Sequence, residues 1–315
     1  MKTSDKIFIA GHNGMVGKAV VAECLNRGYS HILNAAHQDL DLTDQSATNA
    51  YFSQQQPDIV VLAAAKVGGI VANDRYPAEF IRINLAIQSN VIHAAWENGC
   101  RRLLFLGTGC IYPRDAANPI HESALLTGSL EPTNQWYAIA KIAGIKMCEA
   151  YTKQYGFSTI CAMPCNLYGP NDYFDLEKAH VLPALLRKFH EAKTAGDKTV
   201  EVWGSGRPTR EFLHVNDAAD ACLTLLEEDA VTGLVNVGFG QSLTIAELAS
   251  LIAEVTGFEG EVSYDRSRPD GTPEKLLDSQ RMRDVGWRPK IGLRDGIAQT
   301  YQWYLDNVEQ ARGQS

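Results

Sequence analysis

The sequence lacks long apolar runs, an excess of basic residues and closely paired cysteines, and each absence excludes a class of protein. No apolar stretch approaches the roughly 20 residues that cross a bilayer, and the start, MKTSDKIFIAG, lacks the charged-then-apolar pattern of a signal peptide. The net charge of -8 and the pI of about 5.5 argue against nucleic-acid or anionic-membrane partners. The seven cysteines form no C-x-x-C pair, so we expect a reducing, cytoplasmic compartment and no structural zinc.

What the sequence contains instead is an alternation of short apolar strands with helical segments. Strands are predicted at 6–11, 32–37, 58–65, 102–108, 158–166 and 234–238. Helices are predicted at 15–28, 80–99, about 136–155, 244–257 and 293–308. Continuous apolar strands that alternate with helices predict an α/β fold, a Rossmann-type doubly wound parallel sheet with helices on both faces.

Two parts of the chain break this alternation and predict a second domain. We expect residues 1–170 plus about 214–240 to form the dinucleotide-binding domain. Residues of about 171–213 plus 241–315 then form a smaller, discontinuous α/β domain, assembled from separate segments.

A glycine loop, GHNGMVG, follows the first predicted strand and opens the first predicted helix. In this context Gly11 permits a tight turn, Gly14 lets the backbone approach a pyrophosphate, and Gly17 lets the helix pack against the sheet. The free N–H groups and the dipole of the helix N-terminus also favour phosphate. The loop therefore predicts a dinucleotide site. The alternative interpretation of the same sequence is a glycine-rich turn that binds no ligand.

The residues at the end of the second predicted strand bear on the choice between NAD and NADP. An acidic residue there favours NAD, and an arginine favours NADP. This chain has His37 and Gln38 at that point, with Asp39 and Asp41 slightly beyond, which argues against NAD. Lys18 is either an added positive charge for the cofactor or an ordinary exposed helix lysine.

Tyr137 and Lys141 lie four residues apart in QWYAIAK and therefore face the same side of a predicted helix. A free tyrosine has a pKa of about 10, and an ammonium beside it favours the phenolate and lowers that pKa. Such a pair protonates a ketone oxygen as hydride reaches its carbon, but the spacing alone is common on helix faces. Thr108 adds a hydroxyl at the end of a predicted strand, where open α/β sheets place their chemistry.

Seven motifs together resemble the extended short-chain dehydrogenase/reductases: GHNGMVG, LAAAKVGG, GTGCIYP, YAIAK, NLYGP, TREFLHV and PDGTP. The similarity runs from Lys6 to about Asn307, and the longer stretches AAAKVGGIVAN, EPTN with YAIAKIAGIK, and NLYGPND are similar to the GDP-L-fucose synthases within that family. The resemblance implies an NADPH-dependent enzyme that epimerises GDP-4-keto-6-deoxy-D-mannose at carbons 3 and 5. It then reduces the keto group at carbon 4.

The resemblance also implies which residues bind the cofactor and carry the reduction. The triad of the family maps to Thr108, Tyr137 and Lys141, with threonine where serine is common. The implied cofactor-binding residues are Gly11, His12, Asn13, Gly14, Met15, Val16, Gly17, His37, Asp41, Leu42, Leu106, Gly107, Thr108, Gly109, Lys141, Pro164, Asn166, Leu167 and His180. Some relatives carry arginines at the positions of Asn13 and His37, where they can hold the 2′-phosphate of NADP. The rest of the resemblance implies NADPH. Because this chain has Asn13 and His37 in place of those arginines, we expect its preference for NADPH over NADH to be soft.

Epimerisation implies a second catalytic pair, Cys110 and His180. The 4-keto group acidifies the protons on carbons 3 and 5, and inversion needs a base on one face and an acid on the other. Cysteine and histidine suit this task because their ordinary pKa values are about 8.5 and about 6.5. Without the resemblance, Cys110 reads as a small buried apolar side chain and His180 as a histidine that caps the following helix.

The second domain is implied to bind the GDP-sugar. Arg210 has forked donors that suit a diphosphate, Lys188 offers a point charge, and Trp203 is either a surface for the base or sugar or a core tryptophan. The implied substrate-binding residues are Lys188, Trp203, Arg210, Asp270 and Lys275.

Alternatives remain for the substrate, for the class of protein and for the oligomeric state. A relative that makes GDP-colitose shares the same residues, whereas a simple UDP-sugar 4-epimerase would leave Cys110 and His180 without a role. A cofactor-sensing regulator on this fold would lack an intact Thr–Tyr–Lys set. The resemblance also implies a homodimer in which helices at 80–98 and 136–155 pair with their copies, although both helices would equally well only cover the sheet.

Overall fold

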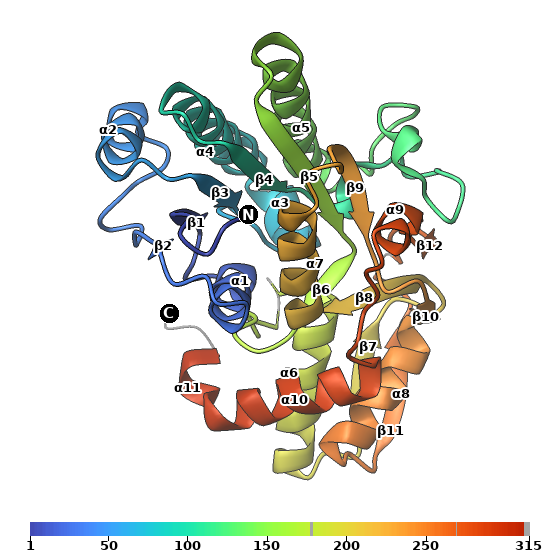
Figure 1. The fold of residues 1–315 in the computed structure, drawn as a ribbon. Coiled ribbons are helices and arrows are strands. Elements are labelled where there is room, and N and C mark those ends of the chain that lie inside the picture. The colour runs from blue at the N-terminus through green and yellow to red at the C-terminus, as the bar shows by residue number, and fades with distance from the viewer. Residues whose placement is uncertain (177–178, 269, 312–315) are drawn as a thin grey trace.

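The computed structural model describes residues 1–176, 179–268 and 270–311. A large parallel sheet with helices on both faces occupies one end of the molecule, and smaller sheets with their own helices occupy the other (Figure 1). The α/β class predicted from the alternation of strands and helices is confirmed.

The main sheet has six parallel strands in the order β2, β1, β3, β4, β5, β9. Their bounds are β1 Ile7–Ala10, β2 Ile32–Leu33, β3 Ile59–Leu62, β4 Arg102–Leu106, β5 Ser158–Pro164 and β9 Gly233–Val237. From β1 the chain runs to β2 on one side and then to β3 on the other, and this reversal creates the crevice where such sheets bind ligands. The second strand was predicted to be longer, but this edge strand pairs with β1 only as far as Leu33.

Helices cover the two faces of the main sheet, as the apolar strands require. They are α1 (Met15–Asn26) and α7 (Val215–Glu227) on one face, and α2 (Gln45–Gln55), α4 (Pro77–Glu97) and α5 (Gln135–Tyr155) on the other. Side chains of β1 alternate between the faces: Ile7 and Ile9 pack in the core under α1 and α7, and Phe8 packs on the α2 side. Helix α2 was not predicted from the sequence, because its residues are mostly polar and it buries little beyond Phe52.

The second part of the molecule is built around short strands and a core of its own. Its strands are β6 (Asn166–Tyr168), β7 (Thr199–Trp203), β8 (Thr209–His214), β10 (Ser242–Thr244), β11 (Glu261–Asp265) and β12 (Glu274–Lys275). Its main helices are α6 (Val181–Ala195), α8 (Ile245–Thr256) and α10 (Leu293–Asp306), followed by α11 (Val308–Ala311). Strand β8 pairs with β6, β10 and β12 and so forms the centre of this part. Short helical segments complete the chain: α3 (Ile70–Arg75), η1 (Gly109–Ile111), η2 (Glu122–Ala124) and α9 (Gln280–Asp284).

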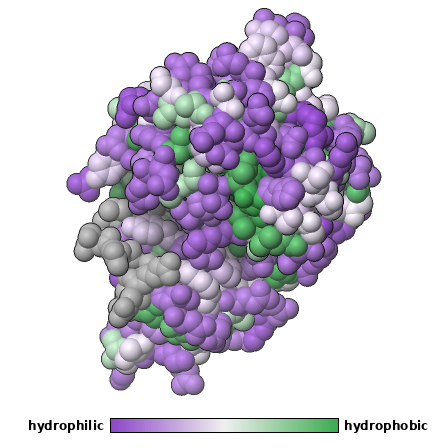
Figure 2. Space-filling model, turned by 60° about the vertical axis from the view of Figure 1, so that its left-hand side comes forward, coloured by the Kyte–Doolittle hydropathy of each residue, from purple (hydrophilic) through white to green (hydrophobic). Residues whose placement is uncertain are grey.

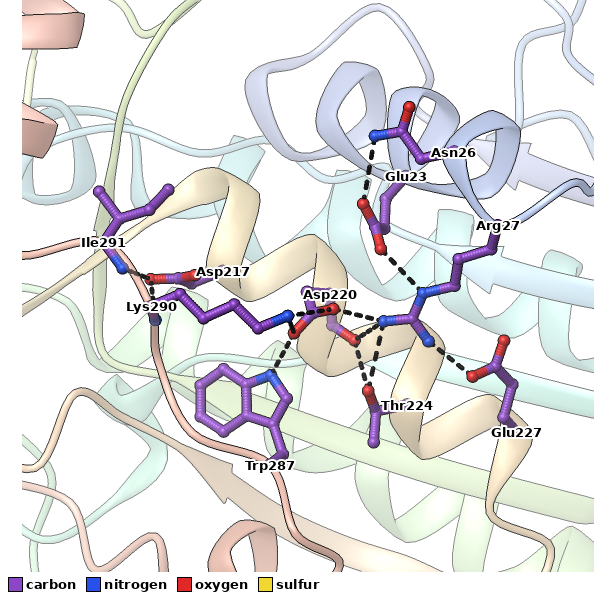
Figure 3. Close-up of polar contacts among 10 residues, drawn as sticks. All are labelled: Glu23, Asn26, Arg27, Asp217, Asp220, Thr224, Glu227, Trp287, Lys290 and Ile291. Atoms are coloured by element: carbon purple, nitrogen blue, oxygen red, sulfur yellow. Dashed lines mark hydrogen bonds and ion pairs between the residues drawn. The ribbon is translucent and has the colours of Figure 1, made fainter.

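A polar network fixes α1 against α7 and the segment 287–291 (Figure 3). The guanidinium of Arg27 pairs with Asp220 at 2.5 Å and with Glu227 at 2.6 Å. The indole N–H of Trp287 donates to the other oxygen of Asp220 at 2.8 Å. Because these groups are largely shielded from water, the network holds the two helices that support the first strand and the glycine loop.

The face shown in Figure 2 is mostly polar, and an apolar patch lies near its centre. Within the described ranges, no helix is long and apolar enough to cross a membrane. The same residues contain no group of three or more His, Cys, Asp or Glu side chains that would hold a metal ion.

Candidate active site

The glycine loop lies at the crevice between β1 and β3 and has no room for side chains at two positions. Gly11 has a φ of +89°, and a Cβ there would lie 2.7 Å from the backbone nitrogen of Ala64, which follows β3. A Cβ on Gly17 would lie 2.1 Å from the carbonyl oxygen of Gly11. The close approach at Gly17 is to the residue that directly follows β1, and α1 packs in one core with Ile7 and Ile9 of that strand.

The start of α1 offers free donors for a phosphate. Gly14 is the N-cap residue and has no side chain, so the first N–H groups of the helix are not capped by it. In the same loop, the imidazole nitrogen Nδ1 of His12 is buried without a hydrogen-bond partner among the described residues. The tight loop, the uncapped helix and this orphaned nitrogen fit a dinucleotide pyrophosphate.

The predicted adenosine side is open, and the carboxylate of Asp41 is already hydrogen-bonded. His37 and Asp41 are exposed, while Leu42 is buried. Backbone and side-chain hydrogen bonds from Thr43, at 2.9 and 2.8 Å, lower the pKa of Asp41, to which His37 adds by charge. Lys18 is not a free surface lysine, because its Nζ donates to Asn171 Oδ1 at 2.8 Å.

The other predicted cofactor residues follow the carboxyl ends of two neighbouring strands. Leu106 ends β4, and Gly107, Thr108 and Gly109 follow it. Pro164 ends β5, and Asn166 and Leu167 open β6. Since β4 and β5 are paired in parallel, both groups lie at the edge of the sheet where open α/β sheets bind ligands.

Tyr137 and Lys141 lie in the first turns of α5, with Lys141 buried at 3% exposure. The Lys141 Nζ donates to the Leu106 carbonyl at 2.7 Å and lies 5.9 Å from the centre of the Tyr137 ring. The ring of Phe80 meets Tyr137 edge-on at 6.3 Å and fixes its other side. The Lys141 side chain thus lies between the end of β4 and the Tyr137 ring, with Lys141 buried and Tyr137 partly exposed.

The electrostatics of this pair differ from the prediction. Burial lowers the pKa of Lys141 from 10.5 to about 8. The pKa of Tyr137 is raised, mainly because burial destabilises the phenolate and also because of Cys110. The prediction that Lys141 lowers the pKa of Tyr137 was therefore wrong, since the ammonium is desolvated and directed at the Leu106 carbonyl.

Cys110 lies beside Thr108 in a pocket at the end of β4. Its backbone N–H donates to Thr108 Oγ1 at 3.2 Å. The pocket is lined by Thr108, Gly109, Cys110, Pro164, Cys165, Asn166, Glu211, Lys275 and Leu277. Because Cys110 is half-buried and opens into this pocket, it is not simply a small buried apolar side chain.

His180 is the N-cap residue of α6, as the alternative interpretation had it, but its side chain makes no capping hydrogen bond. The residue is exposed, yet desolvation lowers the pKa of its imidazole. His180 is not among the residues that line the Cys110 pocket.

Arg210 and Lys275 lie opposite each other on the paired strands β8 and β12. Lys275 lines the Cys110 pocket. Desolvation lowers the pKa of Arg210, and the nearby Cys110 and Asp270 oppose that shift by charge. Its Nη1 donates to the Thr272 carbonyl at 2.6 Å, which leaves the guanidinium fixed between the pocket and the 270–272 turn.

Trp203 is at the surface, not in the core. It is 41% exposed, with Lys188 Nζ at 5.5 Å and Arg268 Cζ at 4.9 Å from its ring centre. Asp270 accepts hydrogen bonds from the backbone and hydroxyl of Ser205 at 2.6 and 2.7 Å, and so ties its turn to the one after Trp203. The core interpretation of Trp203 was wrong, and an exposed aromatic between two cations suits a polar, anionic ligand.

Sequence reasoning missed three residues around these sites: Phe80, Glu211 and Arg268. Glu211 lies inside the quoted motif TREFLHV without an assigned role, and Arg268 lies outside the quoted motifs, directly before PDGTP. Phe80 had no signal of its own, because its contact with Tyr137 joins residues far apart in the chain.

The chain matches the model of the NAD dependent epimerase/dehydratase family over residues 7–238. It is 58% identical over 305 residues to GDP-L-fucose synthase 1 of Arabidopsis thaliana, covering 97% of this chain and 94% of that protein. It is 50% identical over 320 residues to the GDP-L-fucose synthase of Escherichia coli strain K12, covering 99% and 100%. The GDP-L-colitose synthase of Yersinia pseudotuberculosis is 38% identical over 303 residues, covering 96% and 98%.

Two solved structures that contain NADP are similar along almost the whole chain. The GDP-mannoheptose C4 reductase from Campylobacter jejuni has a TM-score of 0.87 and 37% identity, with 97% of this chain and 99% of that chain covered. A GDP-L-fucose synthetase from Naegleria fowleri has a TM-score of 0.89 and 26% identity, with 99% and 98% covered.

Proposed function

The chain belongs to the NAD dependent epimerase/dehydratase family, and from that premise we propose that it converts GDP-4-keto-6-deoxy-D-mannose to GDP-L-fucose with NADPH. The observation that carries this proposal is the pocket at the end of β4, in which Thr108 and Cys110 lie together. The identity of 58% to one GDP-L-fucose synthase and 50% to another supports the same substrate.

Epimerisation uses Cys110 and His180 as the two proton-transfer groups. The keto group at carbon 4 stabilises the enolate formed when a proton leaves carbon 3 or carbon 5. One side chain removes the proton from one face and the other returns a proton to the opposite face. The cationic Arg210 near Cys110 supports this step, because a positive charge favours thiolate character.

Reduction at carbon 4 uses Thr108, Tyr137 and Lys141. Bound NADPH supplies the hydride, and the glycine loop with the start of α1 holds its pyrophosphate. Burial keeps the pKa of Tyr137 high, so the phenol is protonated at neutral pH and is ready to protonate the forming alkoxide. Lys141, whose pKa of about 8 is near working pH, can return a proton to the tyrosine.

Lys188, Trp203, Arg210, Asp270 and Lys275 bind the GDP-sugar. Support comes from the position of Arg210 and Lys275 on paired strands beside the pocket and from the exposed, cation-flanked ring of Trp203. These residues belong to the smaller domain of about 171–213 plus 241–315, which has its own hydrophobic core.

We propose a cytoplasmic homodimer in which α4 and α5 pair with their copies. Large apolar side chains are exposed on both helices: Leu85 at 36%, Trp136 at 40% and Ile139 at 38%. Such side chains on two adjacent helices suit a helical interface.

A GDP-colitose-type enzyme is the second candidate, because a GDP-L-colitose synthase is similar over 96% of this chain. The higher identity to GDP-L-fucose synthases favours the fucose product. A cofactor-sensing regulator is disfavoured, since the chain retains all three residues of the triad, Thr108, Tyr137 and Lys141.

The test is to incubate the protein with GDP-4-keto-6-deoxy-D-mannose and NADPH and to identify the product by NMR. Consumption of neither compound would refute the proposal, and a different GDP-sugar product would correct the substrate. Tyr137→Phe should stop reduction while solvent deuterium still exchanges into carbons 3 and 5. If that variant also stopped exchange, the separation of roles would be wrong.

Cys110→Ala should abolish the exchange, and Cys165→Ala is the matched control. Cys165 lines the same pocket, but burial raises the pKa of its thiol well above the ordinary value, so it stays protonated. Loss of exchange in both variants would contradict the assignment to Cys110.

A further inference from the structure

The buried carboxylate of Glu211 forms part of the wall of the Cys110 pocket and has no role in the reaction described above. Glu211 lies on β8, immediately after Arg210, and is 0% exposed. Its pKa is raised by desolvation, and backbone hydrogen bonds partly oppose this shift. A buried carboxylate is unfavourable unless its oxygens are bonded, so the bonds it makes account for its presence.

The two oxygens of Glu211 bond two different segments of the chain. Oε1 accepts from the backbone N–H of Gly240 at 2.7 Å, in the turn between β9 and β10. Oε2 accepts from the backbone N–H of Leu277 at 3.0 Å, two residues after β12. Because β9 belongs to the main sheet and β12 to the smaller one, a single side chain joins both parts of the molecule at the pocket.

The segments that Glu211 joins also carry the cations beside Cys110. Arg210 precedes it on β8, and Lys275 lies two residues before Leu277, opposite Arg210 in the strand register. The Glu211 carbonyl also accepts a hydrogen bond from Asn166 Nδ2 at 2.8 Å, which fixes the backbone of β8 against β6. A shift of the carboxylate would therefore move both cations relative to Cys110.

We propose that Glu211 is a positioning residue for the GDP-sugar: its carboxylate holds β8 and the end of β12 so that Arg210 and Lys275 meet the substrate beside Cys110. The identity of the ligand rests on the proposed function, whereas the positioning rests on the geometry around Glu211. Small displacements of binding groups have large effects on binding and rate, so this role is measurable.

Glu211→Gln tests the role with almost no change in shape. Glutamine has one acceptor oxygen, so it can bond the N–H of Gly240 or that of Leu277, but its amide group faces the other donor. We expect the KM for the GDP-sugar and the Kd for GDP, measured by calorimetry, to rise about tenfold. The Kd for NADPH, measured by fluorescence, should change less than about twofold, because the substitution leaves the glycine loop and the hydrogen bond from Asn166 to the Glu211 carbonyl in place.

Gly238→Ala is an independent variant that keeps the carboxylate and moves it. A Cβ on Gly238 would lie 2.3 Å from Glu211 Oε1, so the side chain must shift while its charge remains. The same selective loss of GDP affinity is expected. Glu261→Gln, at an exposed glutamate that opens β11, is the matched control and should bind GDP as the wild type does.

The outcomes separate this inference from the proposed function. Wild-type protein that binds NADPH but neither binds GDP nor turns over the GDP-sugar would overturn the proposed function. If the wild type binds GDP, unchanged GDP affinity in Glu211→Gln and Gly238→Ala would overturn the positioning role. Equal losses for GDP and NADPH, with a large fall in melting temperature, would also overturn it, because they would indicate a merely structural residue.

Discussion

Replacing Lys141 with methionine should stabilise the protein at neutral pH while it abolishes reduction. Lys141 is 3% exposed, and burial lowers its pKa from 10.5 to about 8. One pKa unit corresponds to about 1.4 kcal/mol, so keeping the ammonium charged in the folded state costs about 3 kcal/mol. The lost hydrogen bond to the Leu106 carbonyl offsets about 1 kcal/mol, which leaves a net gain of about 2 kcal/mol.

The sign of the pH dependence follows from the lowered pKa. Below about pH 8 the folded and unfolded states both carry the proton, and the full penalty applies. Between about 8 and 10.5 the folded state releases its proton first, so the stability of the wild type rises with pH. The advantage of Lys141→Met should therefore be largest at neutral pH and shrink toward pH 10.5.

Urea unfolding, followed by tryptophan fluorescence at about pH 7 and about pH 10, measures this difference. Lys146→Met is the control, because Lys146 lies on the same helix with a side chain that is 46% exposed and pairs with Glu149. Lys146→Met should give no comparable gain in stability at about pH 7, because the side chain that it replaces is exposed. A Lys141→Met variant that is less stable than the wild type at pH 7, or whose advantage does not shrink at pH 10, would refute the reasoning.

Three further predictions concern the cofactor loop, the cofactor preference and the helix network. Gly17→Ala should weaken NADPH binding at least about 100-fold in a fluorescence titration, because its Cβ would lie 2.1 Å from the Gly11 carbonyl oxygen; near-normal affinity would contradict the tight loop. His37→Arg should raise the ratio of kcat/KM for NADPH over NADH about tenfold, since arginine binds a phosphate with forked donors; an unchanged ratio would show that this position does not reach the 2′-phosphate. Asp220→Asn should lower the free energy of unfolding by about 2 kcal/mol, because it removes the charge that Arg27 pairs with. GDP affinity should be unchanged. An unaltered urea midpoint would show that the Arg27–Asp220 pair does not stabilise the fold.

The sequence predicted the features whose signal is local. The apolar strands, the glycine loop and the i, i+4 spacing of Tyr137 and Lys141 each follow from periodicity or from a short motif, and the structure has them at the expected positions, except that β2 is shorter than predicted. Helix α2 was not predicted, because its sequence is mostly polar and it is held by burying Phe52 against the sheet. Its existence depends on a surface that the rest of the chain provides.

The chemistry of the site depended on tertiary contacts. The direction of the pKa shift of Tyr137 follows from desolvation, which no spacing in the sequence specifies. The hydrogen-bond partners of the Glu211 carboxylate lie 29 and 66 residues away in the chain. The motif TREFLHV by itself therefore does not indicate which segments this side chain connects. By itself the sequence determined the fold class and the cofactor loop, because these follow from local patterns, whereas the candidate catalytic residues Cys110 and His180 were implied only by the family resemblance of its motifs. Only the tertiary structure decided which charges are buried and which distant strands are joined beside Cys110, because desolvation and long-range hydrogen bonds exist only once the chain is packed.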